Sequence, residues 1–266
     1  MEKVNVAVLG ATGAVGRTMI RVLQERHFPM RSLKLLASPH SAGKVIDLGA
    51  KNGVVEVFSA AALKDVDLVF GAVDHDLAKE YAPLIRRSGA LFVDNSSAFR
   101  LDPDVPLVIP EINARDIRWH HGIVANPNCA TILAMMALSP ILKLTSIKRM
   151  IVSTYQAVSG AGMKGMDELE RQIRDPSAAP DVFPFPIAFN VIPQIGEFDE
   201  AGISSEEWKM QNEGRRILHE ASLQVCCTCV RVPVYRCHSE SIYVETHDAV
   251  SMQAIRQAAE DCSGII

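Results

Sequence analysis

The chain has 266 residues, of which 48% are hydrophobic, and its 27 basic and 31 acidic side chains give a formal net charge of −4. This length suggests about two domains, and the composition is that of a globular protein rather than a disordered or fibrous one. The weakly acidic balance argues against nucleic-acid or anionic-lipid partners, and no apolar run reaches the roughly 20 residues that cross a bilayer. Because no signal peptide precedes the first strand pattern, we expect a cytoplasmic protein.

Cysteine usage agrees with a reducing compartment. Six cysteines occur, at Cys129, Cys226, Cys227, Cys229, Cys237 and Cys262. Disulfide frameworks are typical of short secreted chains, so we expect free thiols here. The clustered cysteines could indicate a metal site, but a strand would place Cys226 on the opposite face from Cys227 and Cys229. Three sulfurs could not then converge on a tetrahedral ion, and we predict no metal site.

Strand and helix patterns alternate through the first half of the chain. They predict strands over residues 3–9, 33–37, 54–58, 67–73 and 91–94, and helices over residues 13–26 and 76–88. This alternation is typical of an α/β fold with a doubly wound parallel sheet of the Rossmann type. Residues 102–128 are rich in proline and are expected to be mostly loop. We therefore predict a dinucleotide-binding domain over residues 1–128.

The second half has longer strands and a different order of elements. It predicts helices over residues 129–142, 164–174, 205–220 and 250–260, and strands over residues 147–155, 223–234 and 239–246. Pro140 is expected to interrupt the first of these helices, and Ser205 to cap the third. The proline-rich residues 176–196 are expected to be irregular. The pattern indicates an α+β domain over residues 129–266.

A glycine-rich turn joins the first predicted strand to the first predicted helix. Its sequence is GATGAVG. Small side chains let the backbone approach a pyrophosphate, and the helix N-terminus attracts the anion. The predicted cofactor contacts are Gly10, Ala11, Thr12, Gly13, Ala14 and Val15. The alternative is a tight turn in an α/β domain that binds no dinucleotide.

The end of the second predicted strand bears on the choice of cofactor. It reads LASPHSAGK and has no acidic residue to bind the ribose hydroxyls of NAD. The side chains that could contact a 2′-phosphate instead are Ser38, His40, Ser41 and Lys44. This loop favours NADP, although a plain polar loop would look the same.

A candidate nucleophile begins the predicted helix 129–142. Cys129 follows Asn128, and a helix N-terminus favours the thiolate, which can attack a carbonyl carbon. Near the end of the chain, Arg231 could clamp a carboxylate and His238 could exchange protons with a thiol. Taken singly, each of these residues could equally be structural.

Eight motifs occur in order and with fitting spacings from residue 4 to about residue 250. They are GATGAVG, ASPHSAGK, VDNSSAFR, PNCAT, TYQAVSGAG, FNVIPQIG, EEWKMQNEGRRIL and RVPVYRCHSES. Together they resemble the motifs of the aspartate-β-semialdehyde dehydrogenases. The resemblance implies a Rossmann-type domain followed by a catalytic and dimerisation domain, and a homodimer built through the second domain.

The resemblance also implies roles for individual side chains. Cys129 would be the nucleophile, His238 the acid/base and Gln156 the residue that orients the acyl group. For the substrate, the implied contacts are Arg231 with the carboxylate, Glu206 with the amino group, and Arg100 and Lys209 with the phosphate. We also assign Asn128 to the substrate, and Ala72, Ser159 and Gly160 to the cofactor.

The implied reaction is the NADP-dependent reductive dephosphorylation of L-aspartyl-4-phosphate to L-aspartate 4-semialdehyde, through a thioacyl intermediate. It belongs to lysine, threonine and methionine biosynthesis. An N-acetyl-γ-glutamyl-phosphate reductase is the nearest alternative, but an acetylated amine would offer no cation to Glu206. A non-catalytic dinucleotide-binding subunit is the other alternative. Since the family continues past the last predicted helix, we expect a C-terminally shortened chain with an incomplete second domain.

Overall fold

The computed structural model describes residues 2–49 and 52–266. It divides into two compact units, the first formed by Met1–Val108 and Arg115–Asn126 and the second by Ile109–Ala114 and Pro127–Ile266. The chain thus passes between units at residues 126 and 127 rather than after residue 128, and a short segment before that point packs with the second unit. No helix in the described ranges is long and apolar enough to span a membrane.

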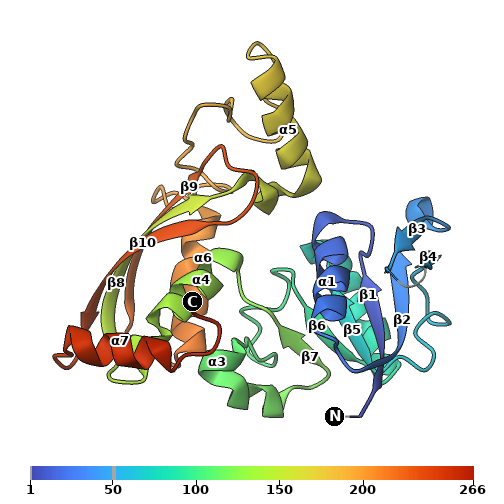
Figure 1. Cartoon of the computed structure of the whole chain (residues 1–266), viewed down its shortest axis with the longest axis horizontal. Helices are drawn as coiled ribbons and strands as arrows, with labels where there is room; N and C mark the ends of the chain where they lie inside the picture. The colour runs from blue at the N-terminus through green and yellow to red at the C-terminus, as the bar shows by residue number, and fades with distance from the viewer. Residues whose placement is uncertain (1, 50–51) are drawn as a thin grey trace. The chain divides into compact units, whose positions relative to one another are not determined.

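One sheet forms the centre of the first unit (Figure 1). Its strand order is β3-β4-β2-β1-β5-β6-β7. The strands are β1 (Val4–Leu9), β2 (Met30–Ala37), β3 (Val45–Asp47), β4 (Asn52–Val57), β5 (Leu68–Gly71), β6 (Leu91–Asp94) and β7 (Ile123–Ala125). Neighbours pair in parallel except β3 and β4, which are antiparallel. The predicted doubly wound parallel sheet is therefore confirmed, with one antiparallel edge strand added.

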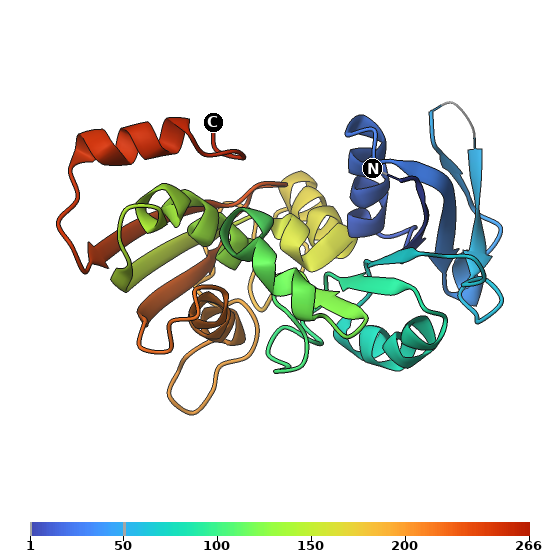
Figure 2. The ribbon, with the colours of Figure 1, turned by 90° about the horizontal axis from the view of Figure 1, so that it is seen from below.

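The positions of two α-helices on the sheet of the first unit follow from the handedness of parallel crossovers. The helix α1 (Ala14–Glu25) connects β1 to β2, and α2 (His75–Arg87) connects β5 to β6. The step from β1 to β2 and the step from β5 to β6 run in opposite directions across the sheet, so right-handed crossovers place these helices on opposite faces. Figure 2 shows them on either side of the strands. The central strand β1 is accordingly buried on both faces from Val6 to Leu9.

The proline-rich residues 102–128 are more regular than their sequence suggests. They contain α3 (Pro110–Asn113), the 3-10 helix Ala114–Trp119 and the strand β7. The prediction of a loop over residues 102–128 is therefore wrong in part. Strands of three residues, such as β3 and β7, are too short to show an alternating pattern.

The second unit packs helices on one face of a three-stranded sheet. The strands are β8 (Ile147–Gln156), β9 (Gln224–Arg231) and β10 (Ser239–Thr246), in the order β10-β8-β9. The helices are α4 (Cys129–Leu142), α5 (Gly162–Arg174), α6 (Ser205–Ile217) and α7 (Met252–Glu260), with α3 and the 3-10 helix Val158–Ala161. Of these, α4 and α6 contact the sheet. The strand β8 pairs in parallel with β9 and antiparallel with β10. This confirms the predicted α+β domain.

The core of the second unit lies between β8 and the helices α4 and α6. Met150 and Val152 of β8 and Met135 of α4 have no exposed surface. Alternate residues of the sheet point the other way, and Ile151 and Tyr243 are exposed. One face of the sheet is therefore covered by helices and the other is open within this unit.

The helix α4 continues through Pro140 to Leu142, so the predicted interruption is wrong. A proline has no N–H to offer the carbonyl four residues earlier, here that of Met136. The hydroxyl of Ser139 donates to this carbonyl oxygen at 2.8 Å instead. A side-chain hydrogen bond thus replaces the missing backbone one, in the last turn of the helix.

The N-cap of α6 is Ser204, not the predicted Ser205. The Ser204 hydroxyl accepts from the Glu207 N–H, and the Glu207 carboxylate accepts from the Ser204 N–H at 2.8 Å. This capping box needs a glutamate or glutamine three residues after the cap. Ser204 has one, whereas Ser205 is followed at that spacing by Trp208. The capping-box spacing in the sequence therefore identifies Ser204 as the N-cap.

We predict that Ser204→Ala destabilises the second unit by about 1 kcal/mol, because it removes the cap of α6. Ser205→Ala serves as the matched control, since Ser205 lies inside the first turn. Urea unfolding followed by circular dichroism measures both. An equal or larger loss for Ser205→Ala would contradict this assignment of the cap.

Candidate active site

The candidate nucleophile lies at the N-terminus of α4, and Asn128 fixes the start of that helix. The Asn128 side-chain oxygen accepts from the Ala130 N–H at 2.9 Å and from the Thr131 N–H at 3.2 Å. The Asn128 N–H in turn donates to the buried Glu213 carboxylate of α6 at 2.6 Å. Cys129 follows this cap and is exposed. A reactant can therefore reach a sulfur whose backbone is firmly held.

Three candidate side chains gather at one edge of the small sheet. Gln156 ends β8 and is in register with Arg231, which ends β9. His238 directly precedes Ser239, which starts β10 and pairs with Tyr155 of β8. Since β8 and β9 run together and β10 runs against them, the carboxyl ends of two strands meet the amino end of the third.

His238 lies against the candidate nucleophile. Its Nε2 is 3.3 Å from the Cys129 sulfur, and its Nδ1 accepts a hydrogen bond from the Ala157 N–H at 3.0 Å. Burial lowers the pKa of His238 below its ordinary value, and the nearby Arg231 charge lowers it further, while a backbone hydrogen bond to Cys237 and the Glu206 charge oppose this. The imidazole is therefore neutral at physiological pH.

Glu206 of α6 joins the helices to the end of β8. Its Oε1 accepts from the side-chain amides of Asn128 at 2.8 Å and Gln156 at 3.1 Å. Its Oε2 accepts from the Lys209 ammonium at 2.9 Å. Burial by itself would raise the pKa of Glu206, but the charge and hydrogen bond of Lys209 and the two amides hold it below its ordinary value. Glu206 is thus an ionised carboxylate inside the protein.

Arg231 is a buried cation, only 6% exposed. Its Nη1 donates to the Ala157 carbonyl at 2.7 Å, and its guanidinium lies over the Phe183 ring at 5.8 Å from the centroid. A Cβ at Gly160 would lie 2.8 Å from Nη1, so only glycine lets this loop approach the guanidinium. Ser159, half-buried, precedes it on the same 3-10 helix. Burial lowers the pKa of Arg231, while the charges of Glu206 and Cys129 raise it.

The glycine-rich turn lies in the first unit, between β1 and α1. Gly10 has φ +83°, and a Cβ there would lie 2.2 Å from the Ala72 carbonyl oxygen. Gly13 is the N-cap of α1 and, because it has no side chain, it makes no side-chain hydrogen bond to the helix. The backbone N–H groups of the first turn, which contains Ala14 and Val15, therefore lack the side-chain acceptor that an N-cap usually supplies. This cradle fits the phosphates of a dinucleotide.

The loop after β2 lies beside this turn. The Thr12 hydroxyl donates to the Ser41 hydroxyl at 3.3 Å, and the Lys44 ammonium lies 3.5 Å from the same oxygen. Ser38 caps the 3-10 helix Pro39–Ser41, and His40 on that helix is exposed. The structure therefore brings the two predicted halves of a cofactor site together within the first unit.

Arg100 also belongs to the first unit, whereas the other predicted substrate residues belong to the second. Its Nε donates to the Asn126 carbonyl at 3.0 Å and its Nη2 to the Asn95 carbonyl at 2.9 Å. The Asn126 amide donates to the Asn95 side-chain oxygen. Backbone carbonyls thus hold this buried guanidinium in place just before the crossing into the second unit.

Comparison with known proteins shows the family. The semialdehyde dehydrogenase NAD binding domain matches residues 5–120, and the semialdehyde dehydrogenase dimerisation domain matches residues 138–265. An aspartate-semialdehyde dehydrogenase of Aquifex aeolicus is 44% identical, over 98% of this chain and 79% of the relative. The chain belongs to the aspartate-semialdehyde dehydrogenase family.

Solved structures of this family agree with the fold. The crystal structure of aspartate semialdehyde dehydrogenase II from Vibrio cholerae, complexed with ASA, has a TM-score of 0.95 at 40% identity and covers 99% of this chain and 80% of that one. The structure from Candida albicans with NADP has a TM-score of 0.76 at 25% identity, over 98% and 78% of the two chains. Family members are oxidoreductases with this pair of domains.

Sequence reasoning missed three groups that hold the candidate site residues in place. They are the N–H of Ala157, the carboxylate of Glu213 and the hydroxyl of Thr154, which donates to the Gln156 side chain at 2.9 Å. Glu213 could have been suspected, because it lies seven residues after Glu206 on the same buried stripe of α6. A sequence does not show which backbone N–H, such as that of Ala157, will donate a hydrogen bond to a side chain.

The cysteines near the end of the chain lie as predicted for a strand. The sulfurs of Cys227 and Cys229 are 3.5 Å apart on the covered side of β9, and Cys226 is exposed. Burial and the neighbouring thiol and carboxylates raise the pKa of Cys227, with the Cys229 hydrogen bond the largest cause. In the described part of the chain, no three histidine, cysteine or acidic side chains gather as a metal site would require.

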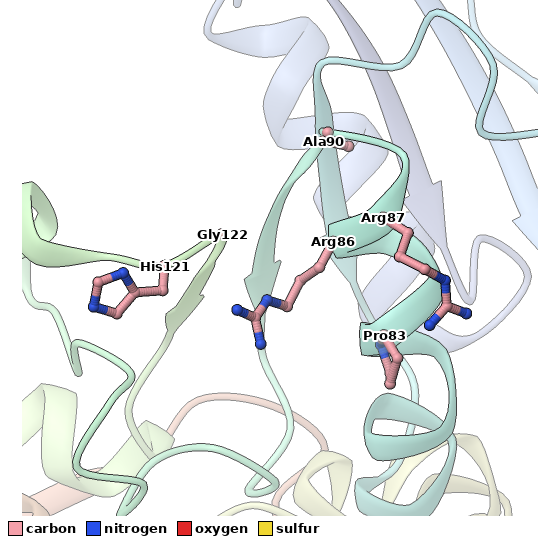
Figure 3. A pocket seen from close by; sticks show the side chains of 7 residues that line it. Pro83, Arg86, Arg87, Ala90, His121 and Gly122 are labelled. Carbon is pink, nitrogen blue, oxygen red and sulfur yellow. The ribbon is translucent and has the colours of Figure 1, made fainter.

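A separate pocket lies in the first unit, at the end of α2 (Figure 3). It is lined by Pro83, Arg86, Arg87, Gly89, Ala90, His121 and Gly122. These residues precede β6 and β7, so the pocket lies at the amino edge of the parallel sheet, whereas dinucleotides bind at the carboxyl edge. Arg86 and Arg87 end α2, where cations offset the helix dipole. The pocket is therefore separate from the glycine-rich turn, which lies at the carboxyl edge of the same sheet.

Glu240 of β10 provides a test of the electrostatics next to the site. Both its carboxylate oxygens are buried without a hydrogen-bond partner among the described residues, and burial raises the pKa of Glu240 to about 7. The folded protein therefore keeps a proton that the unfolded chain loses near pH 4.5. The stabilisation from this group is complete below that pH and is lost as the pH rises to about 7.

We predict that Glu240→Gln raises the melting temperature at pH 8 and removes most of the decline in stability between pH 5 and about pH 7. Glu245→Gln is the matched control, because Glu245 lies on the same strand and pairs with Arg149. Thermal unfolding across this pH range measures both variants. The prediction fails if Glu240→Gln leaves the pH dependence of the wild type unchanged.

Proposed function

We propose that the chain is an NADP-dependent aspartate-semialdehyde dehydrogenase that reduces L-aspartyl-4-phosphate to aspartate 4-semialdehyde and phosphate. The observation that carries this proposal is the contact between the Cys129 sulfur and His238, beside Glu206, Gln156 and Arg231. The relative from Vibrio cholerae, complexed with ASA, supports the same class of substrate. The reaction serves the biosynthesis of amino acids derived from aspartate.

The charges of the site match this substrate. Arg231 is a buried guanidinium able to bind the α-carboxylate in bidentate fashion. Glu206 is the ionised carboxylate for the α-ammonium group, and Lys209 on the same face of α6 is a cation for the phosphate. Arg100 is the second phosphate ligand of the proposal. In the ligand-free protein, Glu206 and Lys209 neutralise each other.

The chemistry starts at Cys129. The helix N-terminus favours the thiolate, which attacks the acyl carbon and expels phosphate to leave a thioester. Gln156, fixed by Thr154 and Glu206, orients the acyl group. Bound NADPH supplies the hydride that reduces the thioester to a hemithioacetal. His238 then acts as the acid/base that takes the proton as the hemithioacetal collapses and releases the aldehyde.

The cofactor proposal rests on the first unit. The turn from Gly10 to Gly13 and the N-terminus of α1 would hold the pyrophosphate. Ser38, Ser41 and Lys44 would contact a 2′-phosphate, and His40 lies on the same loop. Ser159 and Gly160 would contact the nicotinamide half. The NADP in the relative from Candida albicans supports this choice over NAD.

An N-acetyl-γ-glutamyl-phosphate reductase remains the alternative enzyme. An acetylated amine would leave Glu206 without a cationic partner from the substrate, so the buried carboxylate favours the aspartyl substrate. A non-catalytic subunit is less consistent with the structure, since the thiol, imidazole and carboxylate already lie together. We place the reaction in the cytoplasm, because a free thiol nucleophile needs a reducing compartment.

We predict that the purified protein oxidises aspartate semialdehyde only when phosphate is present, and faster with NADP than with NAD. Cys129→Ser should lower kcat by at least about a thousandfold, because no other group replaces the thiolate. Cys226→Ser, which changes an exposed thiol of β9, should keep full activity. A folded wild-type protein that is inactive with both cofactors would refute the proposed function. Preference for the N-acetyl-γ-glutamyl substrate would favour the alternative enzyme.

We also propose a homodimer that forms through the open face of the small sheet. The match to the family's dimerisation domain covers the three strands β8, β9 and β10 of this sheet. Ile151 and Tyr155 of β8 and Tyr243 of β10 are 44%, 45% and 57% exposed on this face, and Ile151 is in register with Tyr243. A second copy of the chain would bury these side chains.

We predict that Ile151→Asp converts the dimer to a monomer in sedimentation velocity, because the new charge would be buried without a partner. Val54→Asp is the matched control: Val54 is 58% exposed on β4 in the first unit and should not affect assembly. A wild-type monomer, or a dimer that tolerates Ile151→Asp, would contradict this surface as the interface.

A further inference from the structure

An irregular segment between α5 and α6, residues 181–192, is attached to α5 by two buried side chains of that helix. They are Glu168 and Gln172. The Glu168 carboxylate accepts from the Asp181 N–H at 2.9 Å. The Gln172 side-chain oxygen accepts from the Ile187 N–H at 2.8 Å. Because a buried carboxylate or amide is costly unless donors surround it, these hydrogen bonds fix the segment to the helix.

The end of the 181–192 segment is bound to β9 at Arg231. The Ile192 N–H donates to the Arg231 carbonyl at 2.9 Å, and the Arg231 N–H donates to the Ile192 carbonyl at 2.8 Å. Ile192 is itself buried. The segment is therefore attached at one end to α5 and at the other end to the strand that carries Arg231. Its buried side chains thus keep a defined position relative to the guanidinium.

Phe183 is the side chain of this segment that contacts the guanidinium. Its ring is buried, and the guanidinium carbon of Arg231 lies over it at 5.8 Å from the centroid. A Cβ at Gly165 would lie 3.1 Å from the Phe183 Cζ, so α5 has a glycine where the ring packs. Because Pro184 follows, the backbone of Phe183 is restricted to extended conformations. The local sequence and the tertiary contacts thus fix the same ring.

This ring stabilises the buried cation without competing with a ligand for it. A phenyl face attracts a cation within about 6 Å of its centroid, but it has no oxygen or nitrogen that could accept from an N–H group. The Nη1 of Arg231 donates to the Ala157 carbonyl at 2.7 Å, and a guanidinium has further N–H donors that suit a carboxylate. A carboxylate in the place of Phe183 would neutralise the guanidinium, whereas the ring leaves its charge to the substrate.

We propose that Phe183 is a positioning residue of the dehydrogenase reaction, whose ring holds the Arg231 guanidinium in the orientation that receives the α-carboxylate of the substrate. This inference rests on the proposed function of the Cys129 site. Without the ring, the guanidinium turns toward the carboxylate of Glu206, whose charge already acts on it. Phe183 therefore contributes to the selection of substrates that carry an α-carboxylate.

Phe183→Leu tests this role, because it removes the ring and keeps an apolar side chain. We expect its kcat/KM for aspartate semialdehyde to fall by about tenfold, mainly through a higher KM. The kcat/KM for 3-aminopropanal, which is the same aldehyde without the α-carboxylate, should change by less than about twofold. Phe185→Leu is the matched control and should change neither value, since Phe185 also precedes a proline but is 57% exposed. Equal losses for the two aldehydes would show a purely structural role and overturn the proposal.

A second measurement requires no turnover. Iodoacetate and iodoacetamide both alkylate thiols, but only iodoacetate carries a carboxylate that Arg231 could bind beside Cys129. Mass spectrometry of the Cys129 peptide gives the ratio of the two rates, and the exposed Cys226 of the same protein gives the reference ratio. We expect iodoacetate to be favoured at Cys129 in the wild type, and this preference to fall by about fivefold in Phe183→Leu. A preference that is absent from the wild type, or unchanged in the variant, would overturn the proposal.

The experiment does not depend on the folding of Phe183→Leu. If that variant does not fold, 3,5-difluorophenylalanine at position 183 keeps the shape of the ring and weakens its attraction for the cation. The iodoacetate preference should then fall by about threefold, and an unchanged preference would again contradict the role of Phe183. A wild type that turns over no aspartate semialdehyde but loses this preference on substitution would refute the proposed function alone. The two failures are therefore distinguishable.

Discussion

The ionised carboxylate of Glu206 is the constraint on which the second unit depends. A buried charge is costly unless donors surround it, and here the donors come from Lys209, Asn128 and Gln156. Lys209 lies on the same helix, but Asn128 caps α4 and Gln156 ends β8. To solvate one carboxylate, the protein must therefore hold two helices and a strand end together, and that brings Cys129 next to the sheet edge where His238 and Arg231 lie.

Both units place their candidate functional groups at the carboxyl ends of parallel strands. In the first unit, Gly10, Ser38 and Ala72 follow β1, β2 and β5. In the second, Gln156 and Arg231 end the parallel pair β8 and β9. At such an edge the chain leaves the sheet, so backbone N–H groups and loop side chains become available to a ligand. His238 reaches the same edge from the other direction, because β10 is antiparallel to β8.

The sequence predicts this architecture as far as its signals are local. The helices α1, α2 and α5 carry a clear hydrophobic period, whereas the strands β3 and β7 are too short to do so. The motifs name side chains that the structure does bring together, among them Cys129 and His238. They do not predict what holds those side chains, because the Ala157 N–H and the Glu213–Asn128 hydrogen bond join residues far apart in the chain.

A motif therefore predicts which side chains lie together, but not the hydrogen bonds that orient each of them. The resemblance implies an acid/base histidine, and the structure adds that the Ala157 N–H orients this ring by donating to its Nδ1. Two sources of positive potential act near Cys129: the N-terminus of α4 and the buried guanidinium of Arg231. Glu206 offsets part of this potential, because its negative charge acts on both Arg231 and His238, while Lys209 and the two amides stabilise that charge.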